Sequence, residues 1–466
     1  VPVERIVTLA KSFAERKPAV AVCGADVMQG PDGLLHGLAV HSLNILTGSV
    51  NRAGGVLFGN SPPLEPLVDP ALDAPARAGL AAAPIGSAVP IGAGDPARRF
   101  AEAVAGAAAS PVEALFLYYA NPLASSTHPE TWSTALSRIP FIVSFSPFLD
   151  ESARQADLVL PDRLPYERWQ DAPAPSSYGY PVWGLARPLV QPKGSGLATG
   201  DAVLGIAERL GGSVAQSLPY SDFEALLKAR ARGLFAARRG MAYGDEFERT
   251  HYRQMEERGW WLAEDTDFDG FWEELATRGG WTDLFYDDTD PARLARTASG
   301  RIELLPAWLQ ETLAAEGRER HPYVLPAVPI AEPSGEYPLR LIPYRVSTLA
   351  SGTVALERWL AEQPTVLPGR YWVPWVEIHP TSAAALGLRD NASVWVTSAR
   401  GRYRARLKLF PGAAPETVCA PYGIRHPDGE LANPLQLLDG STDPLTGLAC
   451  WSTTFVRLEP GPATVP

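Results

Sequence analysis

Short apolar runs alternate with a helical stretch between residues 114 and 160, and this alternation constrains the fold more than any other feature. Ala114–Tyr119 and Phe141–Phe145 are apolar runs of strand length, Glu130–Arg138 between them has helical spacing, and Leu158–Leu160 is a third, shorter run. Strands joined by helices pair in parallel, because each helix returns the chain to the edge where the last strand began. The sequence therefore predicts an α/β domain built on a parallel sheet.

Ligands of open parallel sheets bind beyond the carboxyl ends of the strands. In this chain those ends are the segments 120–122, 146–147 and 161–162, which include the polar residues Asn121 and Ser146. These segments are the first candidates for a binding site.

The pattern changes to that of a β protein after a linker that holds five prolines between Pro322 and Pro338. Tyr403–Phe410 alternates most regularly, and a turn at Gly401 pairs it with the preceding strand. We expect a compact barrel over residues 338–460. Its expected strands are Leu339–Ile342, Val376–His379, Ser393–Thr397, Tyr403–Phe410, Thr417–Ala420 and Thr454–Leu458.

Upstream of the parallel sheet, Ala19–Cys23 is an apolar run that predicts a buried strand, and Leu34–Leu46 predicts a helix. The segment 46–55 ends in paired glycines and predicts a tight turn with positive φ angles. Asp95-Pro96 predicts a capped helix to about Ala108. The residues from 165 to 200 read as a loop, followed by helices at 202–210 and 220–237.

Composition excludes several classes of protein. The net charge is −11, from 41 basic and 52 acidic residues, which argues against a nucleic-acid binder. There is no apolar run of about 18 residues that could span a membrane. The three cysteines form no C-x-x-C pair, which excludes a four-cysteine iron–sulfur site or a cysteine zinc site within the chain.

Three local motifs have a structural and a functional interpretation, and we favour the structural one for each. Gly92–Ala97 matches the G-x-G-x-x-A fingerprint, but no strand precedes it, so a turn before a capped helix is preferred. Asp265, Asp267 and Asp269 resemble the start of a calcium loop that lacks its closing Glu, so a solvated acidic loop is preferred. Glu167 and Asp171 could act as acid and base, but they have no partner at a fixed spacing.

Taken together, several segments in the same order resemble the molybdopterin oxidoreductases of the dimethyl sulfoxide reductase superfamily. Ser146-Pro147-Phe148 and the Glu167-Arg168-Trp169 run are similar to the quinone-linked, polysulfide-reductase-like members. The segments that carry the resemblance are 46–55 (LTGSVNRAGG), 120–122 (ANP), 146–162 with Glu167, 298–301 (ASGR), 375–423, Asn433 and 443–447 (DPLTG).

The resemblance implies Rossmann-like parallel α/β layers followed by a C-terminal double-psi-type β-barrel. The implied divisions are part of a Rossmann-like domain at 1–118, a second parallel α/β domain at 119–215, a helical or irregular insert and linker at 216–330, and a dinucleotide-binding barrel at 338–460. It also implies a bis-molybdopterin guanine dinucleotide cofactor. Carried over by position, the cofactor-binding residues would be Asn121, Pro122, Ser146, Asp157, Arg345, Ser351, Thr353 and Asn433. No catalytic residue and no metal ligand can be assigned.

Some positions depart from the family pattern. Ala120 stands where a Gly precedes Asn-Pro, Ser146 replaces an Asp, and the barrel has no His around 350–353. The family's cysteine cluster is also absent, so the chain is expected to be the C-terminal half of a large subunit. The cofactor would then be shared with a missing N-terminal half, and no iron–sulfur cluster would lie in this chain.

Two functions remain open. In the first, the chain belongs to an oxidoreductase that acts on a small inorganic sulfur or nitrogen compound and exchanges electrons with quinone. In the second, it is a molybdenum-free scaffold in a membrane quinone-oxidoreductase complex. Expected partners are the N-terminal half or a separate chain carrying an iron–sulfur domain, an iron–sulfur electron-transfer subunit and a membrane anchor, with no nucleic acid. A periplasmic or membrane-associated location is expected by analogy.

Overall fold

The alternating segment forms a three-stranded parallel sheet in the computed structural model. Strands β1 (Ala114–Leu117), β2 (Phe141–Ser144) and β3 (Leu158–Val159) lie in that order, and Leu117 of β1 pairs with Ser144 of β2. The helix between β1 and β2 is α7 (Pro129–Leu136), close to its predicted range. The prediction of a parallel α/β arrangement is confirmed.

The structure describes residues 1–59, 61–82, 89–92, 94–173, 179–194, 196–260, 267–284, 297, 299–315, 317, 332–346, 373–425 and 431–462. The chain divides into two compact units. The first contains residues 1–22, 40–83 and 162–304, and the second contains residues 23–39, 84–161 and 305–466. The four-part division expected from the sequence stays a prediction.

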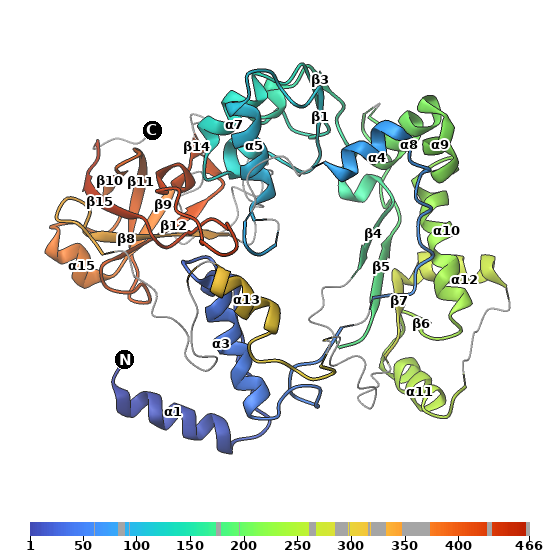
Figure 1. Cartoon of the computed structure of the whole chain (residues 1–466), viewed down its shortest axis with the longest axis horizontal. Coiled ribbons are helices and arrows are strands. Elements are labelled where there is room, and N and C mark those ends of the chain that lie inside the picture. The colour runs from blue at the N-terminus through green and yellow to red at the C-terminus, as the bar shows by residue number, and fades with distance from the viewer. Residues whose placement is uncertain are drawn as a thin grey trace. The chain divides into compact units, whose positions relative to one another are not determined.

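In the second unit, helices α5 (Pro96–Gly106) and α7 cover one face of the parallel sheet (Figure 1). Leu117 and Ile142 point into this layer, where they join Val104, Trp132 and Leu136 in a buried cluster. Asp95 caps α5 by accepting a hydrogen bond from the Arg98 amide, as predicted. The apolar core thus holds the helices against the sheet.

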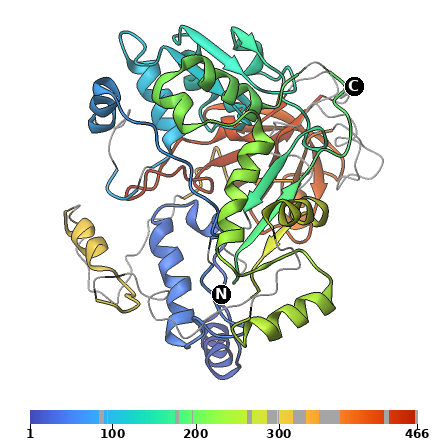
Figure 2. The same cartoon turned by 90° about the vertical axis from the view of Figure 1, so that its right-hand side faces the viewer.

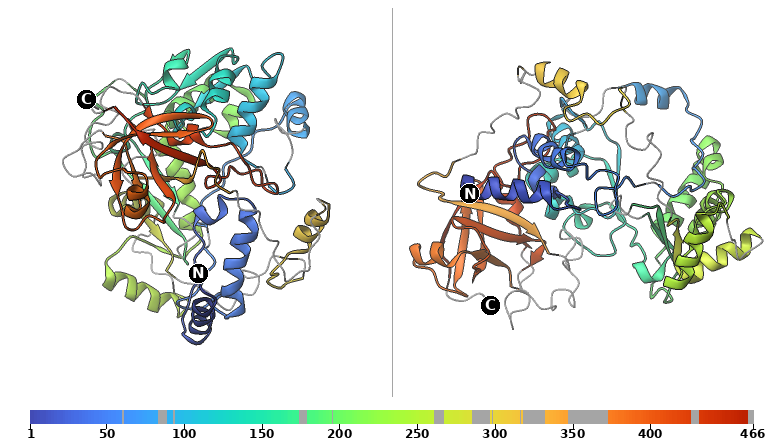
Figure 3. Two further views of the ribbon diagram at one scale, coloured as in Figure 1. Left: turned by 90° about the vertical axis from the view of Figure 1, so that its left-hand side faces the viewer. Right: turned by 90° about the horizontal axis from the view of Figure 1, so that it is seen from below.

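The second unit also contains a closed six-stranded barrel, with strand order β10-β11-β9-β12-β8-β15 (Figure 3). Its inward side chains include Leu341, Val376, Leu407 and Val418, all fully buried. The predicted barrel is therefore confirmed. Its strands are β8 (Leu339–Arg345), β9 (Trp375–Ile378), β10 (Ser393–Ser398), β11 (Gly401–Leu409), β12 (Thr417–Tyr422) and β15 (Phe455–Pro460).

The first unit holds an antiparallel sheet of order β4-β5-β7-β6. Trp183 and Trp281 are fully buried and cluster with residues of helices α10 and α12. These helices lie beside the sheet (Figure 2). The prediction that residues 165–200 form only a loop is wrong, because β4 and β5 lie there. These elements are β4 (Gln170–Pro173), β5 (Val182–Ala186), β6 (Met241–Ala242), β7 (Gly280–Thr282), α8 (Thr199–Leu210), α9 (Gly212–Ser217), α10 (Phe223–Ala236), α11 (Glu246–Glu256) and α12 (Phe268–Arg278).

Ala19–Cys23 does not form the predicted strand. The side chain of the buried Asn44 accepts a hydrogen bond from the Ala21 amide and donates one to the Ala21 carbonyl. The Asn44 side chain thus hydrogen bonds the backbone groups of Ala21 that would otherwise pair with a neighbouring strand.

The turn at 46–55 has the predicted conformation. Gly48, Asn51 and Gly54 have φ angles of +67°, +56° and +74°. A Cβ atom on Gly55 would lie 2.0 Å from the carbonyl oxygen of Ser49, so only glycine fits there.

The remaining elements complete the chain. None of the described helices is long and apolar enough to cross a membrane. The elements not yet named are α1 (Val3–Glu15), α2 (Ala25–Met28), α3 (Gly33–Leu46), α4 (Ala74–Ala81), α6 (Pro122–Ser125), α13 (Ala307–Ala315), α15 (Pro380–Ala385), β13 (Ile424–Arg425), β14 (Leu431–Ala432) and the 3-10 turns Ala153–Gln155, Pro165–Glu167 and Pro434–Leu437.

Candidate functional site

Asn121 anchors the chain just beyond the carboxyl end of β1. It is 1% exposed, its side-chain oxygen accepts a hydrogen bond of 2.7 Å from Ser152, and its amide donates one of 2.8 Å to Glu151. Pro122 follows as the first residue of α6 and is buried. The amide of Asn121 therefore fixes the loop after β1 to the segment after β2.

Asn433 brings the barrel domain to this same edge. Its side-chain amide donates a hydrogen bond of 2.9 Å to the carbonyl of Ala124 in α6, and its oxygen caps the turn at Leu435. At 2% exposure, Asn433 is one of the few buried polar residues of the barrel region. Asn121 and Asn433, which come from widely separated sequence motifs, are thus joined through the four-residue helix α6.

Arg345 is the exposed last residue of β8 and pairs in register with Tyr422 at the end of β12. The chain then continues through β13, which pairs with β14, and β14 leads directly to Asn433. Arg345 therefore lies at the end of the barrel from which the Asn433 segment departs. A guanidinium there can bind an anionic group with two parallel hydrogen bonds.

Ser146 lies beyond the end of β2, as expected. Its hydroxyl donates a hydrogen bond of 2.9 Å to Asp150 and accepts one from the Phe148 amide. Asp150 is itself 3% exposed and also accepts from the Ala153 amide. The hydroxyl of Ser146 and the carboxylate of Asp150 thus hold the turn that follows β2 at the carboxyl edge of the sheet.

Asp157 lies at the other edge of the sheet. Its carboxylate accepts a hydrogen bond of 2.7 Å from the Ile142 amide at the start of β2. The structure therefore does not bring Asp157 together with Asn121 and Ser146. Ser351 and Thr353 lie outside the described residues.

We add two tyrosines at the end of β1, which sequence reasoning did not select, to the candidate site. Tyr118 and Tyr119 are 46% and 58% exposed, and their rings meet edge to face with centroids 4.8 Å apart. The signal available in the sequence was a pair of large aromatic residues directly before Ala-Asn-Pro. Glu151 and Ser152, which bind Asn121, were also missed.

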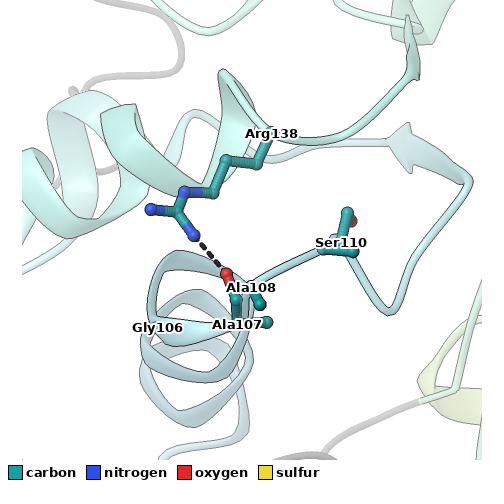
Figure 4. A pocket seen from close by; sticks show the side chains of 6 residues that line it. Gly106, Ala107, Ala108, Ser110 and Arg138 are labelled. Carbon is teal, nitrogen blue, oxygen red and sulfur yellow. Dashed lines mark hydrogen bonds between the residues drawn. The ribbon is translucent and has the colours of Figure 1, made fainter.

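A pocket of about 490 Å³ lies at the amino edge of the sheet, not at the candidate site (Figure 4). It is lined by the end of α5, by residues 107–110 and by Arg138, whose guanidinium donates a hydrogen bond to the Ala107 carbonyl. This hollow shares no residue with the carboxyl-edge network.

Asp265 lies outside the described residues, and the other candidate carboxylates have structural partners. Asp267 caps α12 through the Gly270 amide, and Asp269 forms an ion pair of 2.8 Å with Lys228, whose hydrogen bond lowers the pKa of Asp269. Glu167 accepts from the Leu164 and Lys193 amides. Among the residues that the structure describes, no group of three or more His, Cys, Asp or Glu side chains could hold a metal ion.

Asp171 accepts a hydrogen bond of 2.9 Å from the indole nitrogen of Trp183. This contact ties β4 to the core of the first unit. It gives Asp171 the structural role that the sequence favoured over acid–base catalysis.

Two family models match the chain. The model described as molybdopterin oxidoreductase matches residues 6–170, and the model described as molydopterin dinucleotide binding domain matches residues 362–454. The chain belongs to the molybdopterin oxidoreductase family. The second match covers the segment from β9 to β12 and Asn433, and the first covers the parallel sheet with Asn121 and Ser146.

Relatives of this molybdopterin oxidoreductase family chain include a subunit named menaquinone reductase, molybdopterin-binding-like, from Nitratidesulfovibrio vulgaris. It is 26% identical over 464 residues, which are 98% of this chain and 55% of the relative. The thiosulfate reductase molybdopterin-containing subunit of Salmonella typhimurium is 24% identical over 314 residues, 66% of this chain and 37% of the relative. The chain thus spans about half the length, or less, of these relatives.

Among solved structures, acetylene hydratase from Pelobacter acetylenicus shares the fold of this family member. Its TM-score is 0.70 at 19% identity, and the alignment covers 99% of this chain and 63% of that chain. The two family matches reach from residue 6 to residue 454. They give no support to the expectation that the chain is only a C-terminal half, or that its cofactor is shared with a missing half.

The residues at the carboxyl edge fit the nucleotide part of a molybdopterin dinucleotide. Exposed aromatic rings of Tyr118 and Tyr119 suit a flat base, and the carboxylate of Glu151 suits the N–H donors of guanine. At the barrel end, Arg345 suits a pyrophosphate. These are the chemical groups that a guanine dinucleotide requires.

Proposed function

We propose that this chain forms the dinucleotide-holding part of a molybdopterin guanine dinucleotide-dependent oxidoreductase. The hydrogen bond from Asn433 to Ala124 carries this proposal, because it connects the dinucleotide-binding barrel to the carboxyl edge of the parallel sheet within one unit. A long anionic ligand that crosses strand ends needs contacts from both elements.

Each group has a binding role in this proposal. Arg345 holds the pyrophosphate, Asn121 keeps the loop after β1 in place, and Ser146 with Asp150 shapes the edge of the nucleotide site. When bound, the cofactor supplies two-electron chemistry at molybdenum. The chain contributes orientation and charge, and the candidate site contains no residue that we assign to proton transfer.

The names of the relatives support a proposal for the substrate and the partners. We propose a small inorganic sulfur or nitrogen compound as substrate and electron exchange with quinone through an iron–sulfur subunit and a membrane anchor. Support comes from relatives named as subunits of menaquinone reductase and thiosulfate reductase. Such a complex would be periplasmic or associated with the membrane.

The test replaces Arg345 by Gln in the natively purified protein, and pterin and guanine nucleotide released by acid are then measured. We expect the pterin content to fall by about ten-fold, because one charge-assisted phosphate contact of roughly 1.5 kcal/mol or more is lost. Arg389→Gln, which removes an exposed arginine elsewhere in the same barrel domain, is the control. Equal pterin content in the two variants would refute the role of Arg345.

A molybdenum-free scaffold is the second candidate. It is favoured by the relative named molybdopterin-binding-like and by the amides of Asn121 and Asn433, which hydrogen bond protein groups. In this case wild-type protein would carry no pterin, whereas the first proposal requires pterin before any substitution is made.

A further inference from the structure

Tyr119 has a backbone conformation that a large aromatic residue rarely adopts. Its φ angle is +50°, in the left-handed region that glycine favours. The residue is also 58% exposed, so burial in a core does not compensate for the conformation. Outliers of this kind concentrate at ligand sites, where the surrounding structure enforces them.

The surroundings explain how the conformation is held. On one side, the Phe145 amide donates a hydrogen bond of 2.9 Å to the Leu117 carbonyl and extends the pairing of β1 with β2. On the other side, the buried Asn121 is fixed by Ser152 and Glu151. The backbone bends between these two anchors, and Tyr119 lies within the bend.

An ordered series of aromatic rings places the side chain of Tyr119. Phe116 contacts Phe145 at 5.9 Å between centroids, Tyr118 contacts Phe145 at 6.5 Å, and Tyr119 contacts Tyr118 at 4.8 Å, each nearly edge to face. We call these four residues the aromatic row. Phe145 is 3% exposed and contacts both Phe116 and Tyr118, so one buried ring supports the row, which ends at the exposed Tyr119 beside the strand ends.

We propose that the ring of Tyr119 stacks on the purine base of the dinucleotide. The inference rests on the proposed function and deepens it by assigning the base to the end of the aromatic row. Aromatic faces bind bases by stacking, and this binding tolerates any base. Asn121, two residues after Tyr119, donates a hydrogen bond to Glu151. The Glu151 carboxylate adds preference for guanine, because it accepts hydrogen bonds from N–H groups that adenine lacks at the same positions.

Guanosine monophosphate is the probe, and its affinity for the full chain produced without bound dinucleotide, so that the base site is open, is measured by calorimetry together with thermal unfolding. We expect wild-type protein to bind it more tightly than adenosine monophosphate. Tyr119→Phe keeps the ring and should stay within about two-fold of wild type. Tyr119→Gly removes the ring and should weaken binding about ten-fold, while it raises the unfolding temperature because the left-handed conformation suits glycine.

Glu416→Gly is the matched control. Glu416 is exposed in the barrel domain and has a φ of +59°, so its replacement should also raise the unfolding temperature but leave nucleotide affinity unchanged. The control separates the release of strain from the loss of a stacking surface.

The outcomes distinguish the two proposals. Weaker binding by Tyr119→Gly with normal binding by Tyr119→Phe supports the stacking role. Three results would overturn it: unchanged binding by Tyr119→Gly, tighter binding by this variant, or no binding by wild type. Tighter binding would mean that the Tyr119 ring occupies the place of the base. The proposed function fails on a separate result, the absence of pterin and molybdenum from the native protein.

Discussion

Buried amides hold the candidate site together at the scale of single residues. Asn121 and Asn433 are both almost completely buried, and each uses its oxygen and its amide within the protein. Removing one such side chain leaves a buried backbone or side-chain group without its partner, which costs more than a hydrogen bond at the surface.

We therefore expect Asn433→Ala to destabilise the protein by about 1–3 kcal/mol, because the Ala124 carbonyl loses its donor. Thermal unfolding measures the effect. Gln436→Ala, in the same short turn but half-buried, should change stability much less. Equal stability of the two variants would show that the Asn433 contact does not join the barrel to α6.

Glu256 gives a pH-dependent prediction in the first unit. Burial and the neighbouring Asp283 raise its pKa from 4.5 to about 7, while Asp283 is ion-paired with Arg239. The folded protein thus binds a proton that the unfolded chain releases above pH 4.5. This contribution to stability is complete below pH 4.5 and is lost as the pH rises through about 7.

Glu256→Gln keeps the uncharged form at every pH, so its stability should fall less than that of wild type between pH 4.5 and 7. The difference should reach at most about 2 kcal/mol, because the group is only half-buried and solvent screens it. Unfolding temperatures across this pH range are the measurement, with the exposed Glu257→Gln as control. Parallel curves for wild type and Glu256→Gln would contradict the assignment.

At the scale of secondary-structure elements, the acidic segment before α12 is a helix cap. Asp267 accepts the Gly270 amide, whereas Asp269 lies on the surface and pairs with Lys228. A helix cap stabilises the protein because it bonds a backbone amide of the first helical turn that otherwise has no partner. An exposed ion pair contributes little to stability.

Asp267→Ala should therefore destabilise the protein by about 1 kcal/mol, and Asp269→Ala should leave its stability almost unchanged. Thermal unfolding with and without calcium checks both points. A rise in unfolding temperature on adding calcium to wild type, lost in both variants, would support a calcium loop instead.

The predicted and unpredicted elements differ in the range of the interactions that form them. Strands β1 and β2 follow from short apolar runs and β10 from alternation, and both are patterns contained within a few residues. Strand β4 carries Asp171, whose partner is Trp183 of β5, and the expected strand at Ala19–Cys23 is lost to Asn44. Pairings between distant residues leave no local signal.

The same limit applies to the site. Asn121 and Ser146 could be selected because polar residues at strand ends are a local feature. The conformation of Tyr119 could not, because it depends on Ser152 and Glu151, which lie 31 and 30 residues after Asn121. The direction of Asp157, toward the start of β2, likewise depends on a partner in another strand.

On the scale of the whole molecule, the chain combines a parallel sheet and a six-stranded barrel in one unit with an antiparallel sheet in the other. The family matches cover the parallel sheet and most of the barrel. We propose that these elements together hold a molybdopterin dinucleotide, which binds to the sheet edge and the barrel end.

Molybdenum and iron, measured by inductively coupled plasma mass spectrometry on the natively purified protein with its co-purifying subunits, test this claim most directly. We predict molybdenum equimolar with this chain and accompanied by released pterin and guanine nucleotide. Iron without molybdenum or pterin, in preparations where every subunit is identified by peptide mapping, would contradict the claim and leave the scaffold function in its place.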